Sequence, residues 1–227
     1  SALKIEARYF TTCVVSDQSK DMIRTFWFHK NAVERQADLP KISEARIETV
    51  GILGAGMMGA GLAFICARRG YKVIVKDINQ DALDCGLTHC RTQVDKRLRF
   101  LSTDEKAAVL AKISGTLAVE DLSECDLIIE AVFENIDLKH RVIRETEAVI
   151  KNDAIFASNT SALPIADLAK ASARPDKFIG LHFFSPVEQM PLLEVIQANH
   201  TSEETLARAL SFGRRIKKTS IVVNDGY

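Results

Sequence analysis

The sequence predicts an α/β protein with a doubly wound, mostly parallel sheet, preceded by a helical segment. From residue 47 onward, short apolar runs alternate with stretches in which apolar residues recur every three or four positions. Strands that alternate with helices form parallel sheets, because each crossover helix returns the chain to the same edge. A glycine-rich turn follows the first apolar run and an aspartate ends the second, which is typical of a ligand-binding version of this fold.

Six apolar runs are the predicted strands, and helices are predicted between them. The strands cover residues 49–53, 71–77, 127–132, 154–157, 178–184 and 220–223. The helices cover residues from the glycine turn to 69, 83–98, a segment from 102, 138–151 and a last segment from 201. Glu105 and Glu204 lie three residues after Ser102 and Thr201, a spacing that predicts a capping box at both helix starts.

The first part of the chain differs in pattern from the rest. Residues 5–35 are predicted to be helical, and a polar tetrapeptide divides them into two helices, with Ser19 as the expected N-cap of the second. Residues 36–46 have the composition of a linker. We therefore divide the chain into a helical segment at residues 1–45 and an α/β domain at residues 46–227.

Composition narrows the class of protein. Hydrophobic residues make up 47% of the chain, which is enough to form a full core. Thirty basic residues balance thirty acidic ones, so no net charge attracts nucleic acid or an anionic membrane. The five cysteines form no Cys-x-x-Cys pair, no apolar run is long enough to cross a membrane, and no signal-peptide core is present. We expect a cytoplasmic protein with reduced cysteines and no nucleic-acid partner.

The glycine-rich turn reads Gly-Ala-Gly-Met-Met-Gly. This pattern alone also serves strand–helix packing, but here a predicted strand precedes it and a predicted helix follows it. Gly54 suits a tight turn, Gly56 lets a pyrophosphate approach the backbone, and Gly59 lets the helix lie close to the strand. Met57 and Met58 begin that helix, whose free N–H groups attract phosphate.

Asp77 ends the second predicted strand, eighteen positions after the last glycine of the turn. A carboxylate at this spacing accepts hydrogen bonds from the hydroxyls of an adenosine ribose and repels a 2′-phosphate. The alternative is a solvated aspartate at a strand end, and FAD and S-adenosylmethionine are competing ligands on this scaffold. Strand, glycines, helix and acid together predict a Rossmann-type domain that binds NAD in preference to NADP.

Two ionisable residues interrupt apolar runs late in the chain. His182 lies in a predicted strand between leucine and phenylalanine, and Glu194 lies in a further predicted strand, the apolar run at 192–196. A buried carboxylate is costly unless it is paired, so we expect a His–Glu pair. Such a pair suits alcohol oxidation, in which a base removes the hydroxyl proton. The alternative is a structural histidine whose ring nitrogens are satisfied by neighbours.

Short polar residues follow the fourth predicted strand. Ser158, Asn159, Thr160 and Ser161 are expected at the carboxyl edge of the sheet, where such folds bind ligands. The alternative is helix capping from Leu163 onward, with Ser161 as the cap residue. Both roles are compatible, because different members of the cluster can fill them.

These residues together resemble the L-3-hydroxyacyl-CoA dehydrogenase family. The matching motifs are residues 54–59, 130–135, 158–161, 180–186 and 193–195. The resemblance implies NAD-dependent oxidation of a (3S)-3-hydroxyacyl-CoA to a 3-ketoacyl-CoA, with His182 as the base, Glu194 as its partner and Ser161 as a donor to the substrate oxygen. It further implies three residues near the nicotinamide ribose and the active site: Glu134, Lys139 and Asn159.

The N-terminal segment narrows the resemblance. Residues 6–10, 19–28 and 184–192 are similar to the multifunctional alpha subunit of the fatty-acid β-oxidation complex. In that subunit, a helix joins an enoyl-CoA hydratase module, which is a lyase, to the dehydrogenase module. The resemblance implies an acyl-CoA substrate and a thiolase subunit as a partner.

The chain departs from the family pattern after its last predicted strand. The family continues with a Gly-Phe-x-x-Asn-Arg stretch that supplies a catalytic asparagine, and then with an all-helical domain. Here the sequence stops at Tyr227, and Asn224 precedes that stretch, so we expect the C-terminal helical domain to be absent. The alternatives are an NAD-binding module without efficient catalysis and another β-hydroxy-acid dehydrogenase. Enzymes of the latter kind use lysine as the acid/base, which the His–Glu pair argues against.

Overall fold

The chain divides into two compact units, Ser1–Leu39 and Pro40–Tyr227. The computed structural model describes residues 1–29, 31–32 and 47–226. The linker predicted at residues 36–46 and the boundary predicted between 45 and 46 lie outside the described residues. No helix within the described ranges is both long and apolar enough to cross a membrane.

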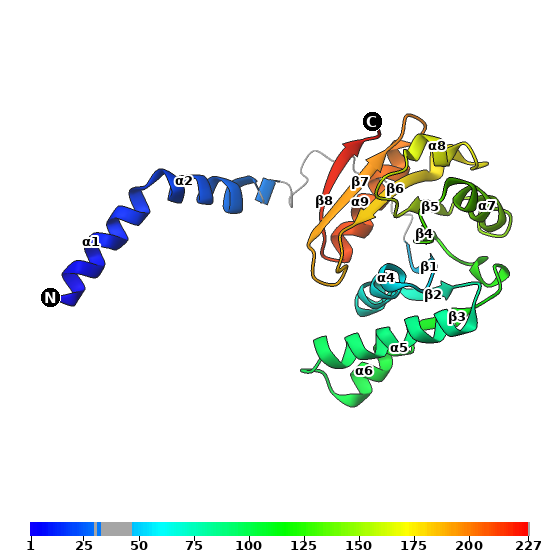
Figure 1. Cartoon of the computed structure of the whole chain (residues 1–227), viewed down its shortest axis with the longest axis horizontal. Helices are drawn as coiled ribbons and strands as arrows, with labels where there is room; N and C mark the ends of the chain where they lie inside the picture. Colours follow the sequence, from blue (N-terminus) through cyan, green and yellow to red (C-terminus); the bar gives the residue numbers. More distant parts are fainter. Residues whose placement is uncertain (30, 33–46, 227) are drawn as a thin grey trace. The chain divides into compact units, whose positions relative to one another are not determined.

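The described part of the first unit is helical (Figure 1). Helix α1 spans Ala2–Val15 and α2 spans Asp17–Ile23, and the π-helix η1 spans Arg24–His29. The N-cap of α2 is Ser16, whose extended backbone separates the two helices and whose hydroxyl accepts from the backbone N–H of Ser19 at 3.2 Å. The prediction of Ser19 as the cap is therefore wrong by three residues, because Ser19 lies inside the first turn.

In the described part of the chain, eight strands form one sheet in the order β3-β2-β1-β4-β5-β6-β7-β8 (Figure 1). Their bounds are β1 Thr49–Leu53, β2 Lys72–Lys76, β3 Ile113–Thr116, β4 Leu127–Glu130, β5 Ile155–Ser158, β6 Phe178–Phe183, β7 Leu192–Gln197 and β8 Thr219–Asn224. Neighbouring strands are parallel, except that β6 and β7 are antiparallel. This sheet confirms the predicted doubly wound, mostly parallel fold. The strand order reverses between β1 and β4, and such folds bind ligands at that reversal, beyond the carboxyl ends of the strands.

Helices connect most of these strands. Their bounds are α4 Met57–Arg68, α5 Gln80–Arg97, α6 Thr103–Leu110, α7 Ile136–Glu147, α8 Ile165–Ala169 and α9 Glu203–Arg215, with 3-10 helices η2 Glu120–Leu122 and η3 Pro175–Lys177. The capping box predicted at Ser102 and Glu105 is present at the start of α6. Every residue of β4 and β5 is buried, and so is the stretch from Gly59 to Ala67 of α4. The core therefore lies along the central strands and the helices that cover them.

The sequence patterns missed one strand, β3, and misplaced the cap of α9 as well as that of α2. β3 reads Ile-Ser-Gly-Thr and lies at the edge of the sheet, so no apolar run reveals it. The N-cap of α9 is Ser202, whose hydroxyl accepts from the backbone N–H of Thr205 at 3.2 Å. The prediction of Thr201 as the cap is wrong, because its hydroxyl donates to the carbonyl of Phe178 at 2.8 Å and fastens the start of β6 instead.

Asp126 anchors the start of β1 from the turn before β4. Its Oδ2 accepts from the backbone N–H groups of Glu48 at 2.8 Å and Thr49 at 2.9 Å, and its Oδ1 accepts from Lys151 Nζ at 3.1 Å. Partial burial alone raises the pKa of this carboxyl, but the two backbone N–H groups and the ammonium outweigh that effect. The pKa of Asp126 therefore lies below its ordinary value.

We expect Asp126→Asn to lower the free energy of unfolding by about 1–2 kcal/mol at pH 7, because two backbone donors lose a charged acceptor. A carboxyl with a lowered pKa in the folded state stabilises the fold above its ordinary pKa, about 4, and loses that stabilisation as the pH falls through the lowered value. The difference between the two proteins should therefore shrink below about pH 4. Urea unfolding followed by circular dichroism measures it, with the exposed Asp153→Asn as the control. A difference that does not change with pH would contradict this account.

Candidate active site at the carboxyl edge of the sheet

The glycine turn after β1 has the geometry of an anion cradle. Gly54 has a φ of 98°, and a Cβ there would lie 2.7 Å from the carbonyl oxygen of Ala131. A Cβ on Gly59 would lie 1.8 Å from the carbonyl oxygen of Gly54, so the first turn of α4 lies directly against the turn. Gly56 is the N-cap of α4, and a Cβ there would meet nothing within 4 Å. The backbone at Gly56 is therefore open to a phosphate group at a helix N-terminus.

Asp77 lies directly after β2 and fastens the glycine turn. Its Oδ2 accepts from the backbone N–H of Ala55 at 2.7 Å, and its Oδ1 accepts from that of Ile78 at 2.7 Å. Oδ1 also accepts from the backbone N–H of Asn79 at 3.3 Å, whereas Oδ2 keeps a second lone pair that can accept from a ribose hydroxyl. The open backbone at Gly56 and this adjacent carboxylate fit a dinucleotide. The role of Asp77 in holding the turn was not evident from the sequence.

His182 and Glu194 form the expected pair. They lie directly opposite each other in the antiparallel register of β6 and β7, and His182 Nδ1 lies 2.7 Å from Glu194 Oε2. Since a carboxylate only accepts, Nδ1 carries the hydrogen and Nε2 is the ring atom with a free lone pair. The two side chains are 19% and 29% exposed, so the pair is accessible to a ligand. The ring of Phe184 lies 4.7 Å from the imidazole, centroid to centroid.

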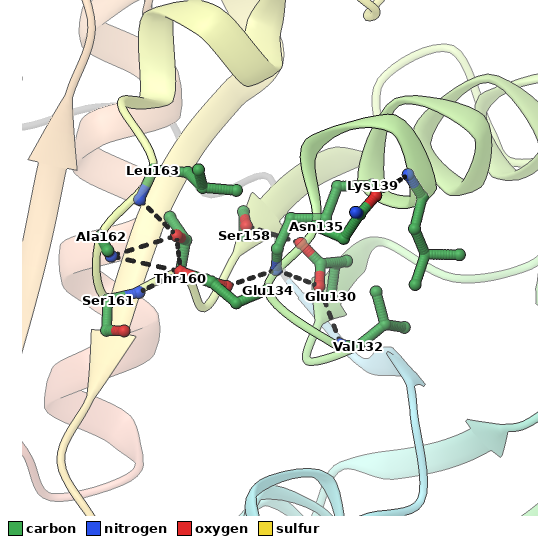
Figure 2. A network of polar contacts seen from close by, with 11 residues as sticks. Glu130, Val132, Glu134, Asn135, Lys139, Ser158, Thr160, Ser161, Ala162 and Leu163 are labelled. Carbon is green, nitrogen blue, oxygen red and sulfur yellow. Dashed lines mark hydrogen bonds and ion pairs between the residues drawn. The ribbon is translucent and has the colours of Figure 1, made fainter.

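A polar network lies at the turn between β4 and α7 (Figure 2). Glu130 ends β4 with its side chain fully buried; its Oε1 accepts from the backbone N–H of Val132 at 2.8 Å and its Oε2 from the hydroxyl of Ser158 at 2.6 Å. Lys139, fully buried in α7, places its Nζ 2.7 Å from Glu130 Oε1 and 3.1 Å from Glu134 Oε2. Glu130 was not predicted as a site residue. Its place in an apolar strand is the same signal that singled out the carboxylate of β7.

Glu134 connects this network to the loop after β5. Its Oε1 accepts from the hydroxyl of Thr160 and from the backbone N–H groups of Ser161 at 3.0 Å and Ala162 at 3.2 Å (Figure 2). Partial burial raises the pKa of Glu134, but the Thr160 hydroxyl, the charge of Lys139 and the Ser161 N–H lower it by more. The pKa lies below its ordinary value, and Glu134 is a carboxylate at neutral pH.

The loop after β5 holds Ser161 by its backbone and leaves its side chain exposed. The local cap is Thr160, whose Oγ1 accepts from the backbone N–H of Leu163 at 2.9 Å. Helix α8 begins only at Ile165, and Asp225 accepts from the first two N–H groups of that helix at 3.1 and 2.7 Å. The capping role considered for Ser161 is therefore wrong, because the helix starts four residues later and a distant carboxylate caps it.

The predicted site residues meet at one edge of the sheet, although they come from different strands. Asp77 follows β2, Glu134 follows β4 and Asn159 follows β5, and all these strands are parallel. His182 precedes the last residue of β6, and the side-chain Oδ1 of Asn159 accepts from the next backbone N–H along that strand at 2.9 Å. Lys139 differs from the others, because its side chain exposes no surface and lies behind Glu134.

Comparison with known proteins identifies a matching family. Residues 49–226 match the family model described as 3-hydroxyacyl-CoA dehydrogenase, NAD binding domain. The chain is similar to the crystal structure of (S)-3-hydroxybutyryl-CoA dehydrogenase PaaH1 from Ralstonia eutropha, with 38% identity and a TM-score of 0.77 over 80% of this chain and 65% of that one. It is also similar to M. tuberculosis FadB2, with 33% identity and a TM-score of 0.76 over 79% of this chain and 65% of that one.

A further similar structure is the dehydrogenase part of multifunctional enzyme 1 from C. elegans. Its identity is 25% and its TM-score is 0.72, over 88% of this chain and 49% of that one. The chain thus spans about two thirds or less of the length of these relatives. The family match covers most of the chain and includes the glycine turn, Asp77, the buried network and the His182–Glu194 pair. The chain therefore belongs to the 3-hydroxyacyl-CoA dehydrogenase family and contains its NAD-binding domain.

Proposed function

We propose that the protein containing this chain oxidises a (3S)-3-hydroxyacyl-CoA to a 3-ketoacyl-CoA with NAD. The observation that carries the proposal is the 2.7 Å contact between His182 Nδ1 and Glu194 Oε2, located at the edge of the sheet where the glycine turn also lies. An imidazole oriented by a carboxylate is the base that alcohol oxidation needs. The relatives named as 3-hydroxybutyryl-CoA dehydrogenase and the family model support the substrate class.

In this proposal, His182 Nε2 removes the proton of the substrate hydroxyl. Glu194 holds the ring through Nδ1 and stabilises the imidazolium that forms. Bound NAD would supply the acceptor for the hydride from C3 of the substrate. Ser161 donates its exposed hydroxyl to the substrate oxygen, and Asn159 fixes the strand that carries His182.

The residues proposed to hold NAD follow the order of the strands. The backbone from Gly54 to Gly59, with Met57 and Met58 in the first turn of α4, receives the pyrophosphate. Asp77 receives the adenosine ribose hydroxyls, and Glu134, whose side chain is 36% exposed, lies toward the nicotinamide ribose, with Lys139 behind it.

The finer context is also part of the proposal. The match to the C. elegans multifunctional enzyme covers 88% of this chain, more than the roughly 80% covered by the single dehydrogenases, so it extends outside residues 49–226. This supports the interpretation of the N-terminal helices as the connection to a preceding enoyl-CoA hydratase module. A multifunctional enzyme of fatty-acid β-oxidation, with a cytoplasmic location and a thiolase subunit as its partner, follows from that interpretation.

The chain should bind NAD more tightly than NADP, because the charge of Asp77 opposes a 2′-phosphate. Asp77→Asn keeps an acceptor for the Ala55 N–H but removes the charge. It should therefore raise the dissociation constant for NAD by roughly tenfold and reduce the difference in affinity between NAD and NADP. Fluorescence titration of both cofactors measures the two affinities. Asp81→Asn removes a nearby charge that does not contact the glycine turn, and it serves as the control. Equal affinity for NAD and NADP in the original chain would refute the role of Asp77.

In the full-length protein, His182→Ala should lower kcat by roughly 10²–10⁴-fold, the range for removal of a positioned base. Glu194→Gln should lower kcat as well, because a neutral amide does not stabilise imidazolium. The dissociation constant for NAD should change little in either variant. Steady-state oxidation of 3-hydroxybutyryl-CoA, with His200→Ala as a surface control, provides the measurement. Turnover near the original rate in His182→Ala would show that this histidine is structural and is not the base of the oxidation.

A further inference from the structure

We propose that Glu130 is a positioning residue for the oxidation proposed above. It acts through Lys139 and Glu134 to fix the loop that presents Ser161. Glu130 itself is enclosed: its side chain exposes no surface, and its two oxygens already accept from a backbone N–H, a hydroxyl and an ammonium group (Figure 2). It therefore touches no ligand and acts only through its neighbours.

The first link is Lys139. Its side chain is fully buried, and its ammonium lies between Glu130 Oε1 at 2.7 Å and Glu134 Oε2 at 3.1 Å. A buried ion pair is weak evidence for stability, since apolar residues of similar volume often stabilise a core equally well. Lys139 instead has a positional role. Because its ammonium is held by the enclosed Glu130, it keeps the partly exposed carboxylate of Glu134 in one place at the ligand-binding edge.

The second link is Glu134. The oxygen that faces away from Lys139 accepts from the Thr160 hydroxyl and from two consecutive backbone N–H groups, those of Ser161 and Ala162 (Figure 2). Hydrogen bonds to an ionised acceptor are about twice as strong as those between neutral groups. One carboxylate thus fixes the backbone on either side of the Ser161 side chain, and the hydroxyl is left exposed for the substrate oxygen.

A parallel link leads to the base. The carbonyl oxygen of Glu130 accepts from the backbone N–H of Asn159 at 2.8 Å. The side chain of Asn159 accepts in turn from the N–H of Phe183, the residue after His182, at 2.9 Å. The end of β4 therefore holds both the serine loop and the strand of the histidine.

The charge of Glu130 determines how strongly the ammonium of Lys139 attracts Glu134. The carboxyl group of Glu130 lies 2.7 Å from the ammonium on the buried side, and Glu134 keeps its Oε1 for the loop. In Glu130→Gln the shape is kept, the amide oxygen can accept from the Val132 N–H, and the amide NH2 can donate to the Ser158 hydroxyl. The ammonium then has Glu134 as its only charged partner in the network. Glu134 is then drawn toward Lys139, and the loop loses its acceptor.

The direct test is amide hydrogen exchange measured by NMR on the 227-residue chain. In Glu130→Gln, the amides of Ser161 and Ala162 should exchange roughly tenfold faster, as expected when hydrogen bonds to a charged acceptor weaken. Glu147→Gln is the matched control, because this α7 carboxylate also accepts from a hydroxyl and a backbone N–H, those of Ser172 and Ala173. It should alter exchange at Ala173 and leave the serine loop unchanged.

Glu134→Gln is the second variant, because its side chain is partly exposed and its replacement does not threaten the core. It should speed exchange at Ser161 and Ala162 even if Glu130→Gln does not fold, which circular dichroism would reveal. If Glu130→Gln folds and does not change the exchange of these two amides, the proposal is overturned, and it is overturned as well if Glu134→Gln does not change them. It is equally overturned if Glu147→Gln changes them as much.

Kinetics of the full-length protein separate positioning from mere stability. Glu130→Gln should lower kcat by roughly tenfold to a hundredfold, a larger factor than the accompanying rise in the dissociation constant for NAD. A change in NAD affinity with kcat unaltered would overturn the proposal. If the original protein does not oxidise 3-hydroxyacyl-CoA at all, the proposed function fails, whereas the exchange result still reports on the positioning of the loop.

Discussion

Parallel strand pairing is the constraint on which the site depends. Because β2, β1, β4, β5 and β6 run in the same direction, every loop that leaves their carboxyl ends emerges at one edge. Groups separated by more than a hundred residues, from Gly54 to His182, therefore lie at the same edge of the sheet. The strand order reverses between β1 and β4, and folds of this kind bind ligands beyond the strand ends at such a reversal.

The antiparallel strand β7 supplies the carboxylate that contacts His182. A carboxylate directly opposite His182 must come from a strand in register with β6, and the pairing of β6 with β7 places Glu194 there. At the opposite side of the site, the carboxylate of Glu130 is enclosed and its partner Lys139 comes from the following helix. The two pairs differ in burial: the side chains of His182 and Glu194 are partly exposed, whereas those of Glu130 and Lys139 expose no surface.

The order of strands and helices could be predicted from apolar periodicity, because buried strands and amphipathic helices leave strong patterns. β3 could not, since an edge strand with little burial has no such pattern. Caps were misplaced at Ser19 and Thr201, because capping depends on which residue adopts an extended backbone, and neighbouring hydroxyls look alike in sequence. His182 and Glu194 were predicted from their apolar surroundings, whereas the partners of Glu130 required knowledge of how α7 lies against β4 and β5.

The double attachment of Asp77 has a consequence for protein engineering. Redesign of cofactor choice in such domains starts by replacing the acid after the second strand with a small or basic residue that admits a 2′-phosphate. Here that acid also holds the N–H of Ala55 at 2.7 Å, in the middle of the glycine turn. A substitution that accommodates the 2′-phosphate therefore also removes a hydrogen bond that stabilises the glycine turn, which must bind the rest of the cofactor. A designer working on this scaffold would have to introduce a replacement acceptor for Ala55 together with the specificity change.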